Sequence, residues 1–311
     1  MRFTTPGPGA QTGERLKRGQ WQAGVAYRHL GADEWFVGRH VREDKAPFGN
    51  PLLININSLD FTVDYGASDR TRLSVTVPFS QGTHSRFYAD GVRHKVSASG
   101  LGDITVMANR WMTPTFEFGI GIKSATGRNN VRSDYYLANG KTTFYVDQSI
   151  QLGDGGWGVI LQGDGFRELF KNGYGYVSGS YLISPRNQTS IVQGQAGPYS
   201  KVHVSVPDVY NARTGLSYAL SPRAFVSLGG RIDGIPQHDL IGRSDGFRRP
   251  AIIGYIEPGL SLTRTRDTVG VSIPLRAYVN FRPSGIDRQL GNTGGGDLAR
   301  TLFFANYQHR F

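Results

Sequence analysis

The sequence predicts an all-β protein: a transmembrane antiparallel up-and-down β-barrel of about twelve strands, with short periplasmic turns and long extracellular loops. Three observations lead to this prediction. Segments of about 10–13 residues alternate between apolar and polar side chains, as strands that cross a bilayer do. The connections between these segments alternate between short and long, and the chain ends on an aromatic residue, Phe311.

The composition of the chain agrees with a barrel and excludes several other classes. Hydrophobic residues make up 38% of the 311 positions, and no apolar run reaches the roughly 20 residues that a membrane helix needs. A barrel avoids this requirement, because only every second residue faces lipid. The absence of cysteine excludes a disulfide scaffold, a thiolate metal site and a cysteine nucleophile, and it fits passage through an oxidising periplasm.

The net charge of +11 raises the question of an anionic partner. Nucleic acid is one partner that such a charge would suit, but the lysines and arginines are scattered over loops and strands. We therefore expect no nucleic acid, and we expect contact with anionic lipid headgroups or steering of anionic solutes.

The chain divides into two parts. Residues 1–18 are rich in glycine, proline and charge, and we expect a flexible periplasmic segment there, followed by the barrel at 19–311. No apolar leader follows Met1. We take the numbering as that of the mature protein with its signal peptide removed, and we expect the bacterial outer membrane.

The connections give the strand count. Short turns are expected where glycine, proline, asparagine, aspartate or serine interrupt the alternation, at 67–70, 113–114, 171–173, 221–223 and 265–267. Long polar stretches lie between these turns, near 31–51, 81–100, 126–155, 185–208, 236–249 and 281–298. Five short turns and six long loops separate twelve strands, so both termini fall on the short-turn side.

The alternation assigns faces to the strands. In the last strand Phe303, Ala305 and Tyr307 share one face with His309 and Phe311. In the strand before it, the same reading places every second residue from Val269 to Val279 on one side, with Arg276 and Tyr278 opposite. Prolines lack an N–H group for a strand ladder, so we expect bulges or strand ends at the three that interrupt proposed strands, Pro78, Pro258 and Pro274.

Aromatic residues mark the ends of the strands. Tryptophan and tyrosine near strand ends, such as Trp157 and Tyr218, are typical of the girdles at both membrane interfaces. The final strand ends in an aromatic pair, Tyr307 and Phe311. We expect this pair to be the signal that the barrel assembly machinery reads.

Four segments together resemble an uncharacterised family of outer-membrane barrels, grouped with the "transporter" or "meta-pathway of phenol degradation" type. The segments are 100–106, 146–150 with 153–158, 229–234 and 244–250. The resemblance implies a membrane barrel that passes small or hydrophobic solutes, and it implies no catalytic residues.

If the apolar rows face lipid, the opposite rows place charges of both signs in the lumen. This reading predicts that the following residues line the lumen, for selectivity or for bracing: Arg28, Asp60, Asp64, Arg72, Glu117, Lys123, Arg213, Arg231, Asp233, Glu257 and Arg276. Two interpretations remain open, a selective constriction for small polar or ionic solutes and a structural charge network that fills the lumen.

The loops carry the excess of positive charge. Contact with lipopolysaccharide phosphates or other anions is expected of Arg42, Lys45, Arg93, Lys95, Arg128, Arg248 and Arg249. The alternative is a solvated polar loop surface, and a glycine-rich loop at 126–155 is expected to fold into the mouth of the barrel.

The expected function is an outer-membrane channel or transporter for small solutes with a narrow, charge-lined lumen. The alternative is a structural barrel, plugged by its own loops or acting as a subunit with a protein partner in a larger assembly. We expect no enzyme, no cofactor and no metal, since the histidines follow no metal-binding spacing. A surface hydrolase using His29, His203, His238 or His309 is the third hypothesis.

Overall fold

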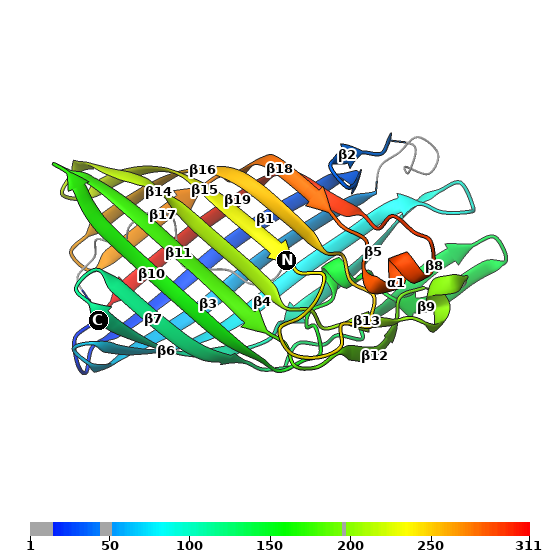
Figure 1. The fold of residues 1–311 in the computed structure, drawn as a ribbon, viewed down its shortest axis with the longest axis horizontal. Coiled ribbons are helices and arrows are strands. Elements are labelled where there is room, and N and C mark those ends of the chain that lie inside the picture. The colour runs from blue at the N-terminus through cyan, green and yellow to red at the C-terminus, as the bar shows by residue number, and fades with distance from the viewer. Residues whose placement is uncertain (1–14, 44–51, 195–196) are drawn as a thin grey trace.

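The computed structural model describes residues 15–43, 52–194 and 197–311, and these form a closed barrel of tilted antiparallel strands (Figure 1). The first half of the wall consists of β1 (Trp21–Val37), β3 (Leu53–Ser68), β4 (Thr71–Phe87), β5 (Arg93–Leu101), β6 (Thr105–Thr113), β7 (Phe116–Lys123) and β10 (Gly158–Phe170). The second half consists of β11 (Gly173–Ile183), β14 (Val209–Ser221), β15 (Ala224–Ile235), β16 (Ala251–Arg264), β17 (Asp267–Ser272), β18 (Leu275–Phe281) and β19 (Gly296–Arg310).

The described strands fill twelve places in the wall, as the alternation predicted. Strands β5 and β6 both pair with β4 and share one place, and β17 and β18 share another between β16 and β19. The last strand pairs with the first from Gln22↔Arg310 to Phe36↔Gly296, which closes the sheet.

The short turns and the long connections separate to the two ends of the barrel. Strands meet through two-residue turns at 69–70, 114–115, 171–172, 222–223 and 265–266, so the five predicted short turns are confirmed. Asn172 has a φ of 64°, a left-handed conformation that asparagine adopts more readily than most residues. The other end (right in Figure 1) carries β2 (His40–Val41), β8 (Arg132–Leu137), β9 (Gly140–Tyr145), η3 (Gln148–Ile150), β12 (Gln188–Val192), η4 (Pro198–Lys201), β13 (His203–Ser205) and α1 (Gly285–Gln289).

The two faces of the wall confirm the outer-membrane assignment. Phe118 and Ile120 on β7 are 41% and 52% exposed, while their neighbour Glu117 is 6% exposed. A soluble sheet would bury the aliphatic row and leave the carboxylate in water. Because the apolar row faces outward and the ionic row inward, the surrounding medium is hydrocarbon.

Two prolines lie beside the two breaks in the wall. Pro78 belongs to β4, where the neighbouring strand stops at Leu101 and resumes at Thr105. Pro258 belongs to β16 and is adjacent to the break between β17 and β18, which contains Pro274. Since proline has no N–H to donate, the adjacent strand loses a ladder hydrogen bond there.

One predicted face is wrong at the long-loop end of β18. Tyr278 is 40% exposed and Val279 is buried, which reverses the expected phase. The pairing shifts between Gly254↔Tyr278 and Tyr255↔Arg276, so Ala277 is an extra residue. Such a bulge flips every side chain beyond it to the other face.

The described end of the predicted N-terminal segment is fastened to the barrel. The guanidinium of Arg15 lies 4.4 Å from the centre of the Trp111 ring, and Gly19 donates a 2.7 Å hydrogen bond to the Gly66 carbonyl. Residues 1–14 lie outside the described residues. No helix in the described part of the chain is both long and apolar enough to cross a membrane.

Candidate functional site: the lumen

The inward face of the barrel carries a ring of ionised side chains, here called the charge belt. Its members are Arg28, Asp60, Asp64, Arg72, Glu117, Asp164, Arg213, Arg231, Asp233 and Glu257. All of them are buried or half-buried, and they come from eight different strands. Most were expected from the alternation, and Asp164 lies in the stretch of β10 where glycines obscure the phase.

The belt contains like charges directly opposite each other. The strand register pairs Glu117 with Asp164 and Arg213 with Arg231. Like charges in such positions repel, so each pair needs a compensating partner from elsewhere. This arrangement places an acidic arc over β7 and β10 and a basic arc over β14 and β15.

Arg72 compensates the acidic arc. Its Nη2 donates to Glu117 Oε2 at 2.9 Å, and its Nη1 lies 3.6 Å from Asp64 Oδ1. Ser74 donates a short hydrogen bond to the same carboxylate of Asp64. The remaining acid, Asp164, accepts a 2.6 Å hydrogen bond from Gln162. One guanidinium on β4 therefore joins the neighbouring strand β3 to β7, which lies beyond β6.

Carboxylates compensate the basic arc. Arg231 Nε donates to both oxygens of Asp233, at 3.0 and 2.9 Å. Arg213 Nη1 lies 3.6 Å from Glu257 Oε1, which also accepts a 2.8 Å hydrogen bond from Ser272. The same basic side includes Arg28, which donates to the Ser58 hydroxyl at 3.3 Å.

A cavity of about 180 Å³ lies along the belt. Its wall combines charged groups with hydroxyl and amide groups, many of them from the neighbouring strands β3, β4 and β6. Lining residues include Thr62, Asp64, Arg72, Ser74, Thr76 and Asn109. The cavity thus offers donors and acceptors to a small solute at the level where the barrel is most charged.

Lys123, expected in the lumen, is covered by residues 146–156, here called the inner loop. Its ammonium group donates to Asp103 Oδ2 at 3.2 Å, to Asp154 Oδ1 at 2.6 Å and to the Gly156 carbonyl at 2.5 Å. Asp103 also accepts from the backbone of Gly127 and Asp154. Lys123 and Asp103 together therefore fasten both ends of the long β7–β10 connection to the inside of the wall.

Two inward-facing glycines make room for the inner loop. A Cβ atom on Gly82 of β4 would lie 2.7 Å from the Ile150 side chain, and one on Gly100 of β5 would lie 2.9 Å from Leu152. Because no real Cβ comes so close, only glycine permits this approach. The predicted inward folding of a glycine-rich loop is therefore seen, with η3 against β4.

Arg249 holds the inner loop at a second place. Its guanidinium lies 3.7 Å from Asp147 Oδ2 and 4.0 Å from Asp297 Oδ2, over the Trp35 ring. Burial tends to raise the pKa of Asp147, but Arg249, His84 and hydrogen bonds from Ser149 outweigh it and lower this pKa to about 2. Asp147 therefore stays ionised across the physiological range.

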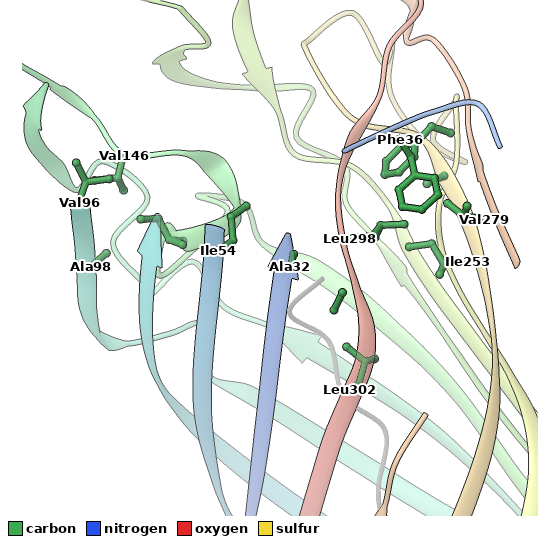
Figure 2. Packing of buried hydrophobic residues seen from close by; sticks show 14 of the residues in the cluster. Ala32, Phe36, Ile54, Val96, Ala98, Val146, Ile253, Val279, Leu298 and Leu302 are labelled. Atoms are coloured by element: carbon green, nitrogen blue, oxygen red, sulfur yellow. The ribbon is translucent and has the colours of Figure 1, made fainter. Parts of the chain in front are cut away.

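Above the charge belt the interior becomes apolar. Figure 2 shows two groups of side chains facing across the long-loop end: Ile54, Val96, Ala98 and Val146 in one group, and Phe36, Ile253, Val279, Leu298 and Leu302 in the other. These residues belong to one buried cluster, here called the mouth cluster. Sequence reasoning missed it, although extending the β3 alternation back from Asp60 places Ile54 inward.

The remaining lumen candidate, Arg276, packs against the mouth cluster. Its guanidinium stacks over the Phe36 ring at 4.5 Å, forms a short ion pair with Glu34 and donates to the Ala299 carbonyl at 3.2 Å. It joins β18 to β1 and β19 across the barrel seam.

The residues expected to contact lipopolysaccharide occupy different environments. Lys95 and Arg128 are exposed, Arg42 and Arg93 are half-buried, and Lys45 lies outside the described residues. Arg249 faces the inner loop.

The structure places Arg248 elsewhere than the sequence suggested. It is 1% exposed, its Nη1 donates to Asp239 Oδ1 and its Nη2 to the Ser205 hydroxyl, both at 2.6 Å. The reason is that two long loops, 184–208 and 236–250, pack together around this pair. Arg248 is therefore a structural residue and has no free surface for a phosphate.

The proposed assembly signal lies at the short-turn end. The Tyr307 hydroxyl donates to Asp267 at 2.7 Å, and the Phe311 amide donates to the Trp21 carbonyl at 2.9 Å. The Phe311 side chain is 66% exposed, so it is available to a partner.

Deleting Phe311 tests that signal. We expect a lower yield of folded barrel in the outer membrane, because the exposed ring is no longer available to the assembly machinery. The folded structure itself loses the hydrogen bond from the Phe311 amide to Trp21. The measurement is the fraction of protein that shifts in gel mobility on boiling. The control is Leu220→Ala, an exposed aliphatic residue near another short turn; an equal yield from both variants contradicts the signal.

Hydrolase and metal chemistry find no support in these positions. His29 contacts Asn57 and His309 contacts Asp267, at 2.9 and 2.8 Å. Across residues 15–43, 52–194 and 197–311, no group of three or more histidines and acids could hold a metal ion.

Comparisons with known proteins support the same fold. The chain matches the COG4313 outer membrane channel from Pseudomonas putida F1 with a TM-score of 0.64 and 15% identity, over 99% of this chain and 100% of that chain. It matches the translocator domain of the autotransporter NalP from Neisseria meningitidis with a TM-score of 0.50 and 12% identity, over 96% and 90%. No family model and no curated protein sequence matches the chain. The expected likeness to outer-membrane transporter barrels is confirmed at the level of the fold.

Proposed function

We propose that the protein is an outer-membrane channel that passes small solutes through the cavity along the charge belt. The observation that carries the proposal is a cavity of about 180 Å³ on the inner face of a closed barrel. A protein cavity of about 150 Å³ accommodates one benzene molecule. The size therefore suits solutes of about one ring, and the matched Pseudomonas putida barrel is itself described as a channel.

The belt favours cations among charged solutes. Its carboxylates outnumber its guanidiniums, and Lys123 is neutralised by Asp103 and Asp154. A narrow passage with low-dielectric walls concentrates ions of the opposite sign.

Planar bilayers test the proposal. We expect discrete conductance steps and a reversal potential in a KCl gradient that reports preference for potassium. The double variant Glu117→Gln with Asp164→Asn should move that potential towards chloride, since it neutralises the acidic arc without removing volume. The control is Glu168→Gln, an exposed residue near a short turn. A silent wild-type barrel contradicts the proposal.

The rival function, a structural barrel plugged by its own loops, is favoured by one observation. The inner loop occupies part of the mouth and is fastened by Lys123 and Arg249. A plugged barrel should stay silent in bilayers and should co-purify with a protein partner. Conductance through the wild-type protein distinguishes the two functions directly.

A further inference from the structure

Residues Leu240–Arg243, in the connection between β15 and β16, expose an adjacent pair of aliphatic side chains. Leu240 and Ile241 are 66% and 55% exposed, and Gly242 and Arg243 are exposed beside them. Two neighbouring exposed aliphatic residues on a polar loop are costly in water. They therefore call for an apolar partner.

The backbone of this segment is fixed in place. Leu240 N donates to Asp208 Oδ2, Asp208 N donates to Asp239 Oδ1, and Arg243 N donates to Asn187 Oδ1, each at 2.8 Å. The Asp208 side chain is fully buried. These hydrogen bonds therefore hold the backbone in a conformation that exposes both aliphatic side chains.

These contacts place the segment on the outer side of the wall. Alternation along β11 and β14 puts Tyr181 and Tyr210 on the outward face, since Ser180 and Asn211 are buried on the inward face. The two tyrosine rings stack at 6.3 Å, and the Tyr181 hydroxyl donates to Asp208 at 3.0 Å. One carboxylate thus joins an outward-facing tyrosine to the backbone of Leu240.

The level of the segment is that of the membrane interface. Tyrosine and tryptophan gather where hydrocarbon meets headgroups, and Trp157 at the same end of β10 is 62% exposed. Val177 lies on the same face of β11 as Tyr181, four residues earlier, and belongs to the exposed apolar band. The aliphatic pair therefore continues the lipid-facing surface beyond the ends of the strands.

We propose that Leu240–Arg243 is a lipid anchor of the outer leaflet. Leu240 and Ile241 insert among the acyl chains, and the Arg243 guanidinium binds a phosphate of the same phosphorylated lipid. The long stem of arginine can cross the interface while its charged end stays among headgroups, and guanidinium–phosphate hydrogen bonds are strong. The anchor requires the outer-membrane fold only, so it stands whether the lumen is open or plugged.

Site-directed spin labelling tests the insertion, because the chain has no native cysteine. Leu240→Cys and Ile241→Cys carry the label, and Val92→Cys, 53% exposed between β4 and β5, is the matched control. In vesicles of phosphatidylethanolamine and lipid A, we expect the labels at 240 and 241 to collide more with oxygen than with a water-soluble nickel complex, and the label at 92 to show the reverse. Equal nickel collision at all three positions overturns the insertion.

The variant Arg243→Gln tests the proposed contact between the guanidinium and a lipid phosphate. Adding Arg243→Gln to the labelled Ile241→Cys protein should increase nitroxide mobility in lipid A vesicles, whereas Arg128→Gln, an exposed arginine of another loop, should leave it unchanged. Mobility unaffected by Arg243→Gln overturns the role of the guanidinium.

Discussion

Replacing Lys123 with methionine should release the inner loop and raise the conductance of the barrel. The ammonium group is buried against Asp103 and Asp154, and removing one partner of a buried ionic group costs about 3–5 kcal/mol. The two carboxylates then repel each other across the base of the β7–β10 connection. We expect larger single-channel steps in planar bilayers and faster proteolysis within 127–156 from the extracellular side.

The matched control is Lys171→Met, which removes an exposed lysine from a short turn and should leave both readouts unchanged. Unaltered conductance together with unaltered proteolysis in Lys123→Met would show that Arg249 and the apolar contacts hold the inner loop without Lys123. In that event the Arg249–Asp147 ion pair and the packing of Ile150 against Gly82 are the principal attachments.

Replacing Arg248 with methionine should destabilise the packed loops 184–208 and 236–250 by a similar amount. The variant leaves Asp239 buried without its cation, which corresponds to about 3–5 kcal/mol. The loops that share this pair also position Asp208 and Leu240. We expect earlier loss of loop structure in urea, measured by limited proteolysis of 184–208 in reconstituted vesicles.

A second variant separates the lost ion pair from the lost volume. Combining Arg248→Met with Asp239→Asn should recover much of the stability, because the amide removes the unpaired buried charge while its oxygen can still accept from the Asp208 amide. Arg223→Met, at an exposed turn position, serves as the surface control. A double variant as unstable as the single one would contradict an electrostatic origin.

The wall of the barrel was predictable because its signals are local. Turn residues such as Asn172 and alternating rows such as Phe118 and Glu117 depend only on neighbours in sequence. The reversed face at Tyr278 was not predictable, since the bulge at Ala277 depends on the pairing with β16. The breaks beside Pro78 and Pro258 were predictable in part. The missing N–H can be read from the proline itself, but which neighbouring strand is interrupted depends on the pairing.

The sequence predicted which residues line the site, but it did not predict which of them form ion pairs with each other. Period two placed Arg72, Arg213 and Glu117 inward, but no local signal assigned Arg72 to both Glu117 and Asp64. Loop charges were less predictable still. Arg248 and Arg243 lie close together in one polar stretch, and only the packing of two loops decides that the first is buried and the second exposed.

The seam between β1 and β19 sets the order in which this chain can mature. Strand β1 finds its second neighbour only in β19, the last strand of the barrel in chain order, so β1 keeps an unpaired backbone edge until the barrel closes. Contacts between such distant segments form slowly, and an open edge invites pairing with foreign chains. The edge of β1 therefore stays open to such pairing until β19 docks against it and closes the barrel.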